Sequence, residues 1–198
     1  MSGPTLKEQA DLAHAWWRSL RPFETEGGLK LPGDRATLAR LRRCSAPFEA
    51  ATEPATVKLF RNLGFDQRSE AKFGRIAVLA AVLAHVREEP TPLTRLGIAI
   101  GAPAGGEPSD AIVKPIRFKH LVSARGDEEV MIAFRRVVSL LDRTVNVRDL
   151  ARLILSWTDD EAGDRARTRF AFDYHGAGFA APGIDASNSE TTPTPEKV

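Results

Sequence analysis

The residues of this chain that could do chemistry are mostly arginines, and four of them lie close together in the stretch Gly33–Cys44, GDRATLARLRRC. Asp34 is a good N-cap for a helix here, and a helical advance of about 100° per residue places Leu38 and Leu41 on one face. The arginines then cover an arc of roughly 160° on the opposite side, with no acidic partner at helical spacing. Guanidinium groups bind phosphate in a bidentate manner, although most charged helix faces are simply solvated. The four candidate phosphate-binding residues are Arg35, Arg40, Arg42 and Arg43.

Basic residues recur on helices predicted later in the chain. Each group by itself fits an ordinary solvated surface, but groups on separate helices could align into one stripe, the footprint expected of a protein that tracks a phosphate backbone. The net charge of only +2 argues against indiscriminate nucleic-acid binding, so the distribution of charge matters more than its sum. The further candidate nucleic-acid-binding residues are Arg68, Arg117, Lys119, Arg135, Arg136, Arg165 and Arg167.

Other kinds of chemistry find little support in the sequence. The four histidines lack metal-ligand spacing, and the single cysteine, Cys44, cannot build a zinc site. The segment GAPAGGEPS has the outline of a phosphate-binding loop, but Glu107 replaces its essential lysine and Pro108 removes a backbone donor. The adjacent carboxylates of Asp159–Glu161 point to different helix faces, and no nucleophile elbow occurs. We therefore expect no enzyme activity, no cofactor, no metal and no small-molecule substrate.

The elements that position these side chains are predicted to be helices throughout. Of the 198 residues, 42% are hydrophobic and 27% are charged, which is ordinary for a globular chain with a core of its own. Apolar residues recur at spacings of three and four, and no strand alternation appears. Ile76–Val86 is apolar on most sides and is the predicted central core element. The predicted helices cover Leu6–Leu20, Arg35–Cys44, Pro54–Gly64, Arg68–Arg87, Pro115–Ala124, Asp127–Asp142, Asn146–Trp157 and Asp164–Tyr174.

The chain is therefore predicted to be an all-α, two-lobed helical bundle of roughly eight helices. Residues 1–88 form the N-terminal lobe, residues 89–109 a connector rich in proline and glycine, and residues 110–176 the C-terminal lobe. Residues 177–198 read as a polar, proline-rich, disordered tail. No signal-peptide pattern is present, no run approaches 18 apolar residues, and a single cysteine suits a reducing compartment. We expect a cytoplasmic protein with no membrane partner.

Four side chains have a second possible use. The indoles of Trp16 and Trp17 and the phenol of Tyr174 could stack on nucleic-acid bases, but core packing accounts for them better. His85 lies on the predicted core helix, where a packed histidine is expected rather than a ligand.

The order of the motifs resembles a known family. A first helix with tryptophans is followed by GDRATLARLRRC, a long apolar helix, LGIAIG and IRFKHLVSA, and then by MIAFRRVVSLLDRTVNVRDLARLILSW and RARTRFAFDYHG. From roughly Leu12 to Gly176, this order resembles CasB, the small subunit of the type I-E CRISPR surveillance complex Cascade. None of the motifs is a catalytic signature, and the resemblance lies in their order and spacing.

The resemblance implies a non-catalytic subunit in antiviral defence, with an all-α fold of two helical lobes. Two copies would lie head to tail against the backbone subunits that hold the guide RNA, and the large subunit would be a further partner. Basic residues would stabilise the guide RNA–target DNA duplex and the displaced non-target strand, while guide pairing reads the sequence. By position, the family's basic residues correspond to Arg42–Arg43, Arg68, Arg117, Arg135–Arg136 and Arg165–Arg169.

Two features depart from the family pattern. Ser123 stands where many relatives carry arginine, and the acidic Asp159–Glu161 follow Trp157, where a more basic turn is expected. We therefore expect the N-terminal arginine helix, rather than the C-terminal lobe, to be the main contact with nucleic acid. The alternative is a helical adaptor that binds only protein, with its arginines paired to acidic partner surfaces. A solitary DNA-binding repressor fits less well, because the arginine-only helix face lacks Asn or Gln for adenine readout.

Overall fold

The computed structural model of the chain describes residues 3–24, 28, 30–65, 72–103, 106–157 and 160–176. These residues are mostly helical, which confirms the prediction of an all-α chain, although the helices outnumber the eight expected. No helix of this described part is both long and apolar enough to cross a membrane. The α-helices, in chain order, are α1 (Leu6–Ser19), α2 (Arg35–Arg43), α3 (Pro47–Ala51), α4 (Pro54–Asn62), α5 (Phe73–Leu83), α6 (Leu96–Ile100), α7 (Pro115–Ser123), α8 (Gly126–Leu140), α9 (Val147–Ser156) and α10 (Asp160–Tyr174).

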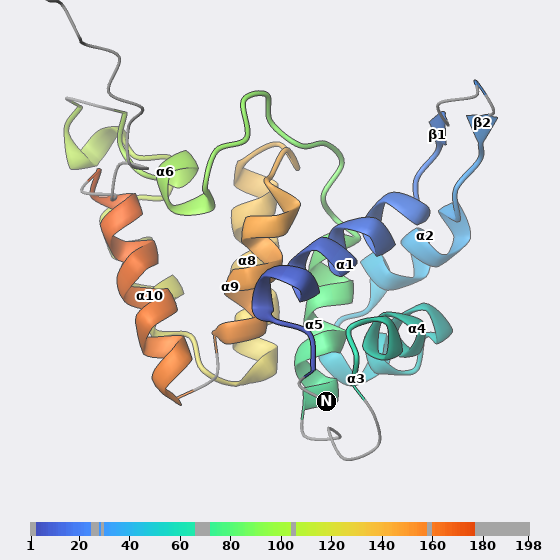
Figure 1. The fold of residues 1–198 in the computed structure, drawn as a ribbon. Helices are drawn as coiled ribbons and strands as arrows, with labels where there is room; N and C mark the ends of the chain where they lie inside the picture. The colour runs from blue at the N-terminus through green and yellow to red at the C-terminus, as the bar shows by residue number, and fades with distance from the viewer. Residues whose placement is uncertain are drawn as a thin grey trace, which may run out of the picture.

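Helix α5 is the central element of the fold. Every residue from Ile76 to Ala84 is buried, as expected of a helix that is apolar on all sides. Helices α3, α4, α8 and α9 all pack against it, and Figure 1 shows it in the middle of this group. The prediction of a central core helix is confirmed, but α5 begins at Phe73. The predicted start at Arg68 lies outside the described residues.

Helix α1 joins the N-terminal half of the chain to the C-terminal half. Thr5 and Glu8 form a reciprocal capping box at its start. Trp16 and Trp17 are buried, whereas Leu12 is exposed. Helix α1 packs along α9, and α5 packs against α8, so the buried residues of both halves form one connected core. The boundaries of the two predicted lobes stay a prediction.

Two five-residue helices, α3 and α6, were not predicted. Helix α3 has a proline at its first turn, where a missing N–H costs nothing. Helix α6 lies within the segment predicted to be a connector, and its Leu96 and Ile100 are buried against α10. The close approach of α6 to α10 requires Gly97, because a Cβ there would lie 2.6 Å from the Cβ of Asp173.

A short hairpin connects α1 to α2 in place of the predicted loop. Strands β1 (Phe23–Glu24) and β2 (Lys30–Leu31) pair antiparallel. Beyond the hairpin, Gly33 adopts a positive φ of 67°, and a Cβ there would lie 2.3 Å from the carbonyl carbon of Arg21. The N–H of Asp34 donates to the carbonyl of Leu20 at 3.0 Å. These contacts fix the start of α2 beside the end of α1.

The ends of the C-terminal helices differ in part from the prediction. The helix predicted from Asn146 begins there, because Asn146 caps α9 and accepts from the N–H of Asp149 at 3.1 Å. The helix predicted from Asp127 begins one residue earlier, at Gly126, and the N–H of Arg125 donates to the carboxylate of Glu129 at 2.8 Å. Helix α10 begins four residues before the predicted Asp164.

Candidate nucleic-acid interface

Helix α2 forms and docks as its sequence predicts. The Asp34 carboxylate accepts from the Thr37 N–H at 2.9 Å and from its hydroxyl at 2.7 Å, which satisfies a free donor of the first turn. Leu38 and Leu41 are buried, so the leucine face packs inward and the arginine face turns outward.

The four arginines of α2 have different surroundings. Arg35 and Arg43 are exposed, and neither has a hydrogen-bond or ion-pair partner among the described residues. Arg40 pairs with Glu53, at the start of α4, with 2.8 Å between Nε and the carboxylate oxygen. The sequence offers no acidic partner at helical spacing, but Arg40 has one in the fold, because Glu53 comes from the start of another helix.

The fourth arginine, Arg42, is half-buried and lies over the C-terminal end of α5. Its Nε donates to the carbonyl of Ala84 at 2.7 Å. Arg21, which follows α1, donates to the carbonyls of Val86 and Arg87 just beyond. Guanidinium groups at a helix C-terminus satisfy free carbonyls and interact favourably with the helix dipole. Part of the positive charge here therefore holds α1 and α2 to α5.

Four arginines gather at this end of α5: Arg21, Arg42, Arg87 and Arg143, hereafter the arginine cluster. Burial, together with Arg143 and Arg87, keeps the pKa of Arg42 below its ordinary value. Burial and the neighbouring Arg42 and Arg87 do the same to the pKa of Arg21, against which Glu88 acts as the compensating carboxylate. Like charges are thus crowded, and a bound anion would relieve their repulsion.

The chain brings this cluster together through backbone contacts between α5 and the turn after α8. The N–H groups of Arg87 and Glu88 donate to the carbonyl of Arg143 at 2.7 and 3.3 Å. Val145 donates back to the carbonyl of Glu88 at 3.0 Å, and Arg143 takes a positive φ of 66°. Arg21, Arg87 and Arg143 were not predicted, because each stands alone in its own segment and only the fold unites them.

His85 lies beside the arginine cluster. Burial, and then the charges of Arg135, Arg42 and Arg143, lower its pKa from the ordinary 6.5 to about 4. Its Nε2 is buried and has no hydrogen-bond partner among the described residues. The side chain is therefore a neutral, partly buried histidine, as predicted for a packed residue.

Arg135 occupies a second structural position. Its guanidinium donates to the carbonyl of Cys44 at 2.6 Å and to that of Leu41 at 3.2 Å, at the C-terminal end of α2. Burial lowers its pKa. Arg135 thus fastens α8 to α2, and this half-buried group is poorly placed for a phosphate.

The remaining candidates of the C-terminal half lie on α7, α8 and α10. Lys119, Arg117 and Arg136 are exposed, and the latter two line a groove between α7 and α8. Arg165 is exposed and pairs with Glu161 at 3.5 Å. Arg167 is only 8% exposed and donates to the carbonyl of Trp157 and, at 2.5 Å, to Asp164, so its charge does not reach the surface.

The aromatic side chains considered for base stacking are core residues. Trp16 and Trp17 donate from their indoles to the carbonyls of Ala55 and Val86 at 3.1 and 3.4 Å. Tyr174 donates to the carbonyl of Val113 at 2.7 Å, and its ring stacks on Phe118 with centroids 3.7 Å apart. All three are at most 5% exposed, which confirms the expectation of core packing.

The structure unites only part of the predicted basic set. Helices α2 and α10 lie on opposite sides of the molecule, with α5, α8 and α9 between them (Figure 1). The exposed Arg43 follows Arg42 of the arginine cluster in the chain, whereas Arg165 and Arg167 lie far away on α10. Arg68 falls outside the described residues. Within those residues, no group of three or more His, Cys, Asp and Glu side chains could hold a metal ion.

Comparison with known families places this geometry in context. The family of CRISPR-associated protein Cse2 matches residues 37–175, from the first turn of α2 to the end of α10, which is more than half of the chain. Three members of the arginine cluster, Arg42, Arg87 and Arg143, lie inside the matched range, and Arg21 lies before it. No curated protein and no solved structure matches the chain.

Proposed function

The chain belongs to the family of CRISPR-associated protein Cse2, the small subunit of type I-E Cascade, and we propose that it binds nucleic-acid backbone through the arginine cluster and the adjoining exposed face of α2. The family is one of structural Cascade subunits and implies association with the other subunits of the complex. The proposed role is non-catalytic, in the cytoplasm, beside the backbone and large subunits and a second copy of this chain.

The crowding of guanidinium groups at the end of α5 carries this proposal. Arg87 is exposed and Arg143 half-buried, and neither side chain has a hydrogen-bond or ion-pair partner among the described residues. Arg42 and Arg21 donate hydrogen bonds to backbone carbonyls just after α5, but their guanidinium groups still contribute positive charge to the cluster. These like charges lie close together, and Glu88 is a nearby carboxylate that offsets part of them. Such a surface is suited to binding an anion, for example a phosphate backbone.

The proposed mechanism is electrostatic and independent of sequence. The guide RNA reads the target by base pairing, while the small subunit neutralises phosphate charge along the guide–target duplex and the displaced non-target strand. Such contacts raise the cost of re-annealing the two DNA strands because the displaced strand must first leave its basic surface. The expected outcome is a longer-lived R-loop.

The lifetime of the R-loop in reconstituted Cascade tests the proposal. Arg43→Ala combined with Arg87→Ala removes two exposed charges whose side chains have no hydrogen-bond or ion-pair partner within the described part of the chain, so the fold should remain intact. We expect the R-loop to dissociate roughly fivefold faster, because two lost surface charge contacts cost about 0.5 kcal/mol each. Arg61→Ala, an exposed arginine on α4, is the matched control and should leave the lifetime unchanged.

The same preparation separates this role from that of a protein-only adaptor. Subunit stoichiometry, measured by native mass spectrometry, should be identical for the double variant and the control. A double variant that fails to enter the complex, or that enters it and keeps the full R-loop lifetime, would support the adaptor and overturn the proposal.

A further inference from the structure

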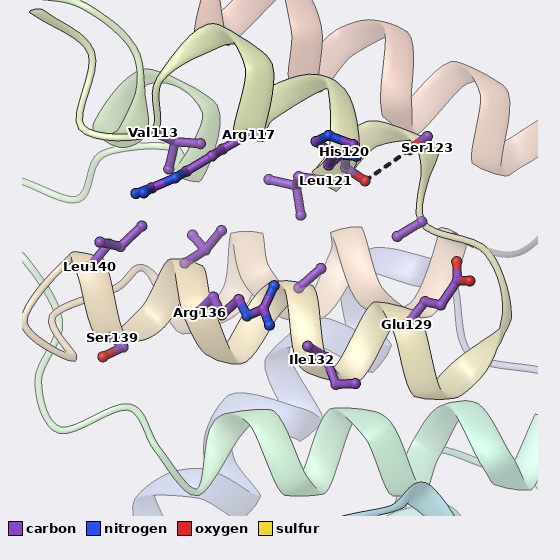
Figure 2. Close-up of a pocket in the computed structure, with 13 residues that line it drawn as sticks. Val113, Arg117, His120, Leu121, Ser123, Glu129, Ile132, Arg136, Ser139 and Leu140 are labelled. Atoms are coloured by element: carbon purple, nitrogen blue, oxygen red, sulfur yellow. Dashed lines mark hydrogen bonds between the residues drawn. The ribbon is translucent and has the colours of Figure 1, made fainter.

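A groove of about 780 Å³ runs between α7 and α8 and is not used by the proposed function. Helix α7 contacts α10 through the stacking of Phe118 on Tyr174 and also contacts α8, and the groove lies along the part of the α7–α8 boundary that the two helices leave open. Figure 2 shows the two helices one above the other, with Leu121 of α7 and Leu140 of α8 directed into this space. The lining runs along α8 from Glu129 to Leu140, about 17 Å at 1.5 Å per residue.

The groove walls are largely aliphatic. Helix α8 supplies Ile132, Ala133, Val137 and Leu140, and α7 supplies Leu121. Ile132 and Leu140 are 40% and 43% exposed, so both present apolar surface to solvent along the groove. About three turns of a second helix would match this length and cover both residues.

The charges on the groove are positive along most of its length. Arg117 of α7 and Arg136 of α8 extend into the space between the helices (Figure 2), and His120 lies on the same side of α7. Neither arginine has an ion-pair partner in the described part of the chain. The one carboxylate of the lining, Glu129, lies at the far end and accepts the N–H of Arg125.

This combination favours a protein occupant over a nucleic acid. Surfaces that hold single strands stack the bases on aromatic rings, and the groove lining contains no phenylalanine, tyrosine or tryptophan. Aliphatic walls flanked by unpaired cations are the features that bind an amphipathic helix with acidic residues along its edges.

We infer that the groove between α7 and α8 is the docking site for an acidic amphipathic helix of another protein subunit. The inference rests on the proposed function only in placing the chain within a Cascade complex. It uses Arg117 and Arg136, which were predicted to contact nucleic acid, and it shares no residue with the arginine cluster. The occupant is defined by apolar residues three and four apart and by a net negative charge.

Site-specific crosslinking in the reconstituted complex tests this inference. Ile132→Cys carries a cysteine-reactive photo-crosslinker, and the buried Cys44 is protected from the reagent. Leu12→Cys on α1, with a similar exposure of 37%, is the matched control site. We expect Ile132→Cys, but not Leu12→Cys, to crosslink to one helical segment of another subunit with net negative charge, identified by mass spectrometry. Arg117→Glu with Arg136→Glu should reduce that crosslink roughly tenfold or more, since like charges then face each other.

Each other result overturns the inference. A crosslink to guide RNA or DNA would assign the groove to nucleic acid, and a crosslink to a second copy of this chain would assign it to self-association. No protein crosslink, or one that the charge reversal leaves unchanged, would mean that no acidic helix docks there. The R-loop test of Arg43→Ala with Arg87→Ala is independent, so the two proposals fail separately.

Discussion

At the scale of single residues, arginine has two distinct uses in this chain. Arg135 and Arg167 are buried or half-buried and donate to carbonyls at helix ends, so they stabilise the packing of one helix against another. Arg43 and Arg87 are exposed, and their side chains have no hydrogen-bond or ion-pair partner among the residues that the structure describes. The sequence does not distinguish these two uses. Arg43, Arg135 and Arg167 all stand in arginine-rich stretches, and Arg87 follows an apolar helix. Only the first use contributes to the stability of the isolated chain.

Arg167→Ala should therefore destabilise the protein. The substitution leaves the buried carbonyl of Trp157 without its donor and removes the ion pair with Asp164, which we expect to lower the free energy of unfolding by about 1–3 kcal/mol. Urea denaturation followed by circular dichroism measures the change. Arg169→Ala, an exposed neighbour on the same helix, should change the stability by less than about 0.5 kcal/mol. Equal effects of the two substitutions would show that the hydrogen bonds of Arg167 do not stabilise the fold.

His85 should make stability depend on pH between about 6.5 and 4. In this range the unfolded chain binds a proton at the imidazole, while the folded chain, with a pKa of about 4, does not. Protons thus favour the unfolded state, and the stability of the wild-type protein relative to His85→Gln should fall as the pH is lowered from 6.5 to 4. Because the side chain is only partly buried, we expect a loss on the order of 1 kcal/mol. Parallel urea titrations at pH 7 and pH 4.5 measure it, and a pH-independent difference would refute this account.

At the scale of elements, helices with a clear apolar period and a capping residue could be predicted from the sequence. Helices α2 and α9 begin where Asp34 and Asn146 indicate. Helices α3 and α6 could not be predicted, because five residues hold little more than one turn and show no period. The arginine cluster was missed for a different reason: its members come from four segments, and only tertiary contacts place Arg143 beside Arg87.

The packing of α6 on α10 gives a prediction at this scale. Gly97→Ala adds a methyl group 2.6 Å from the Cβ of Asp173 and 2.8 Å from the carbonyl oxygen of Phe170, so the two helices must separate. We expect a loss of about 1–3 kcal/mol, as for other overpacked contacts, despite the better helix propensity of alanine. Thermal unfolding compares it with Gly3→Ala, where a Cβ meets nothing within 4 Å. An unchanged midpoint for Gly97→Ala would show that α6 is not held against α10.

At the scale of the whole molecule, one connected core supports two separate surfaces. The arginine cluster lies at the ends of α1, α2, α5 and α8, while the groove between α7 and α8 combines aliphatic walls with exposed arginines. The proposed function uses both kinds of contact, one with nucleic acid and one with other subunits of the complex. The net charge of +2 predicts neither surface, because it does not say where the charged residues lie in the fold.

The most direct test of phosphate contact is the salt dependence of binding to a single-stranded DNA oligonucleotide of mixed sequence. Each phosphate contact on a single strand contributes about −0.7 to the slope of log affinity against log salt. If Arg43 and Arg87 both contact phosphates, the double alanine variant should have a slope smaller in magnitude by about 1.4, with no change in sequence preference, while Arg61→Ala keeps the wild-type slope. An unchanged slope for the double variant would contradict the assignment of this surface to nucleic acid.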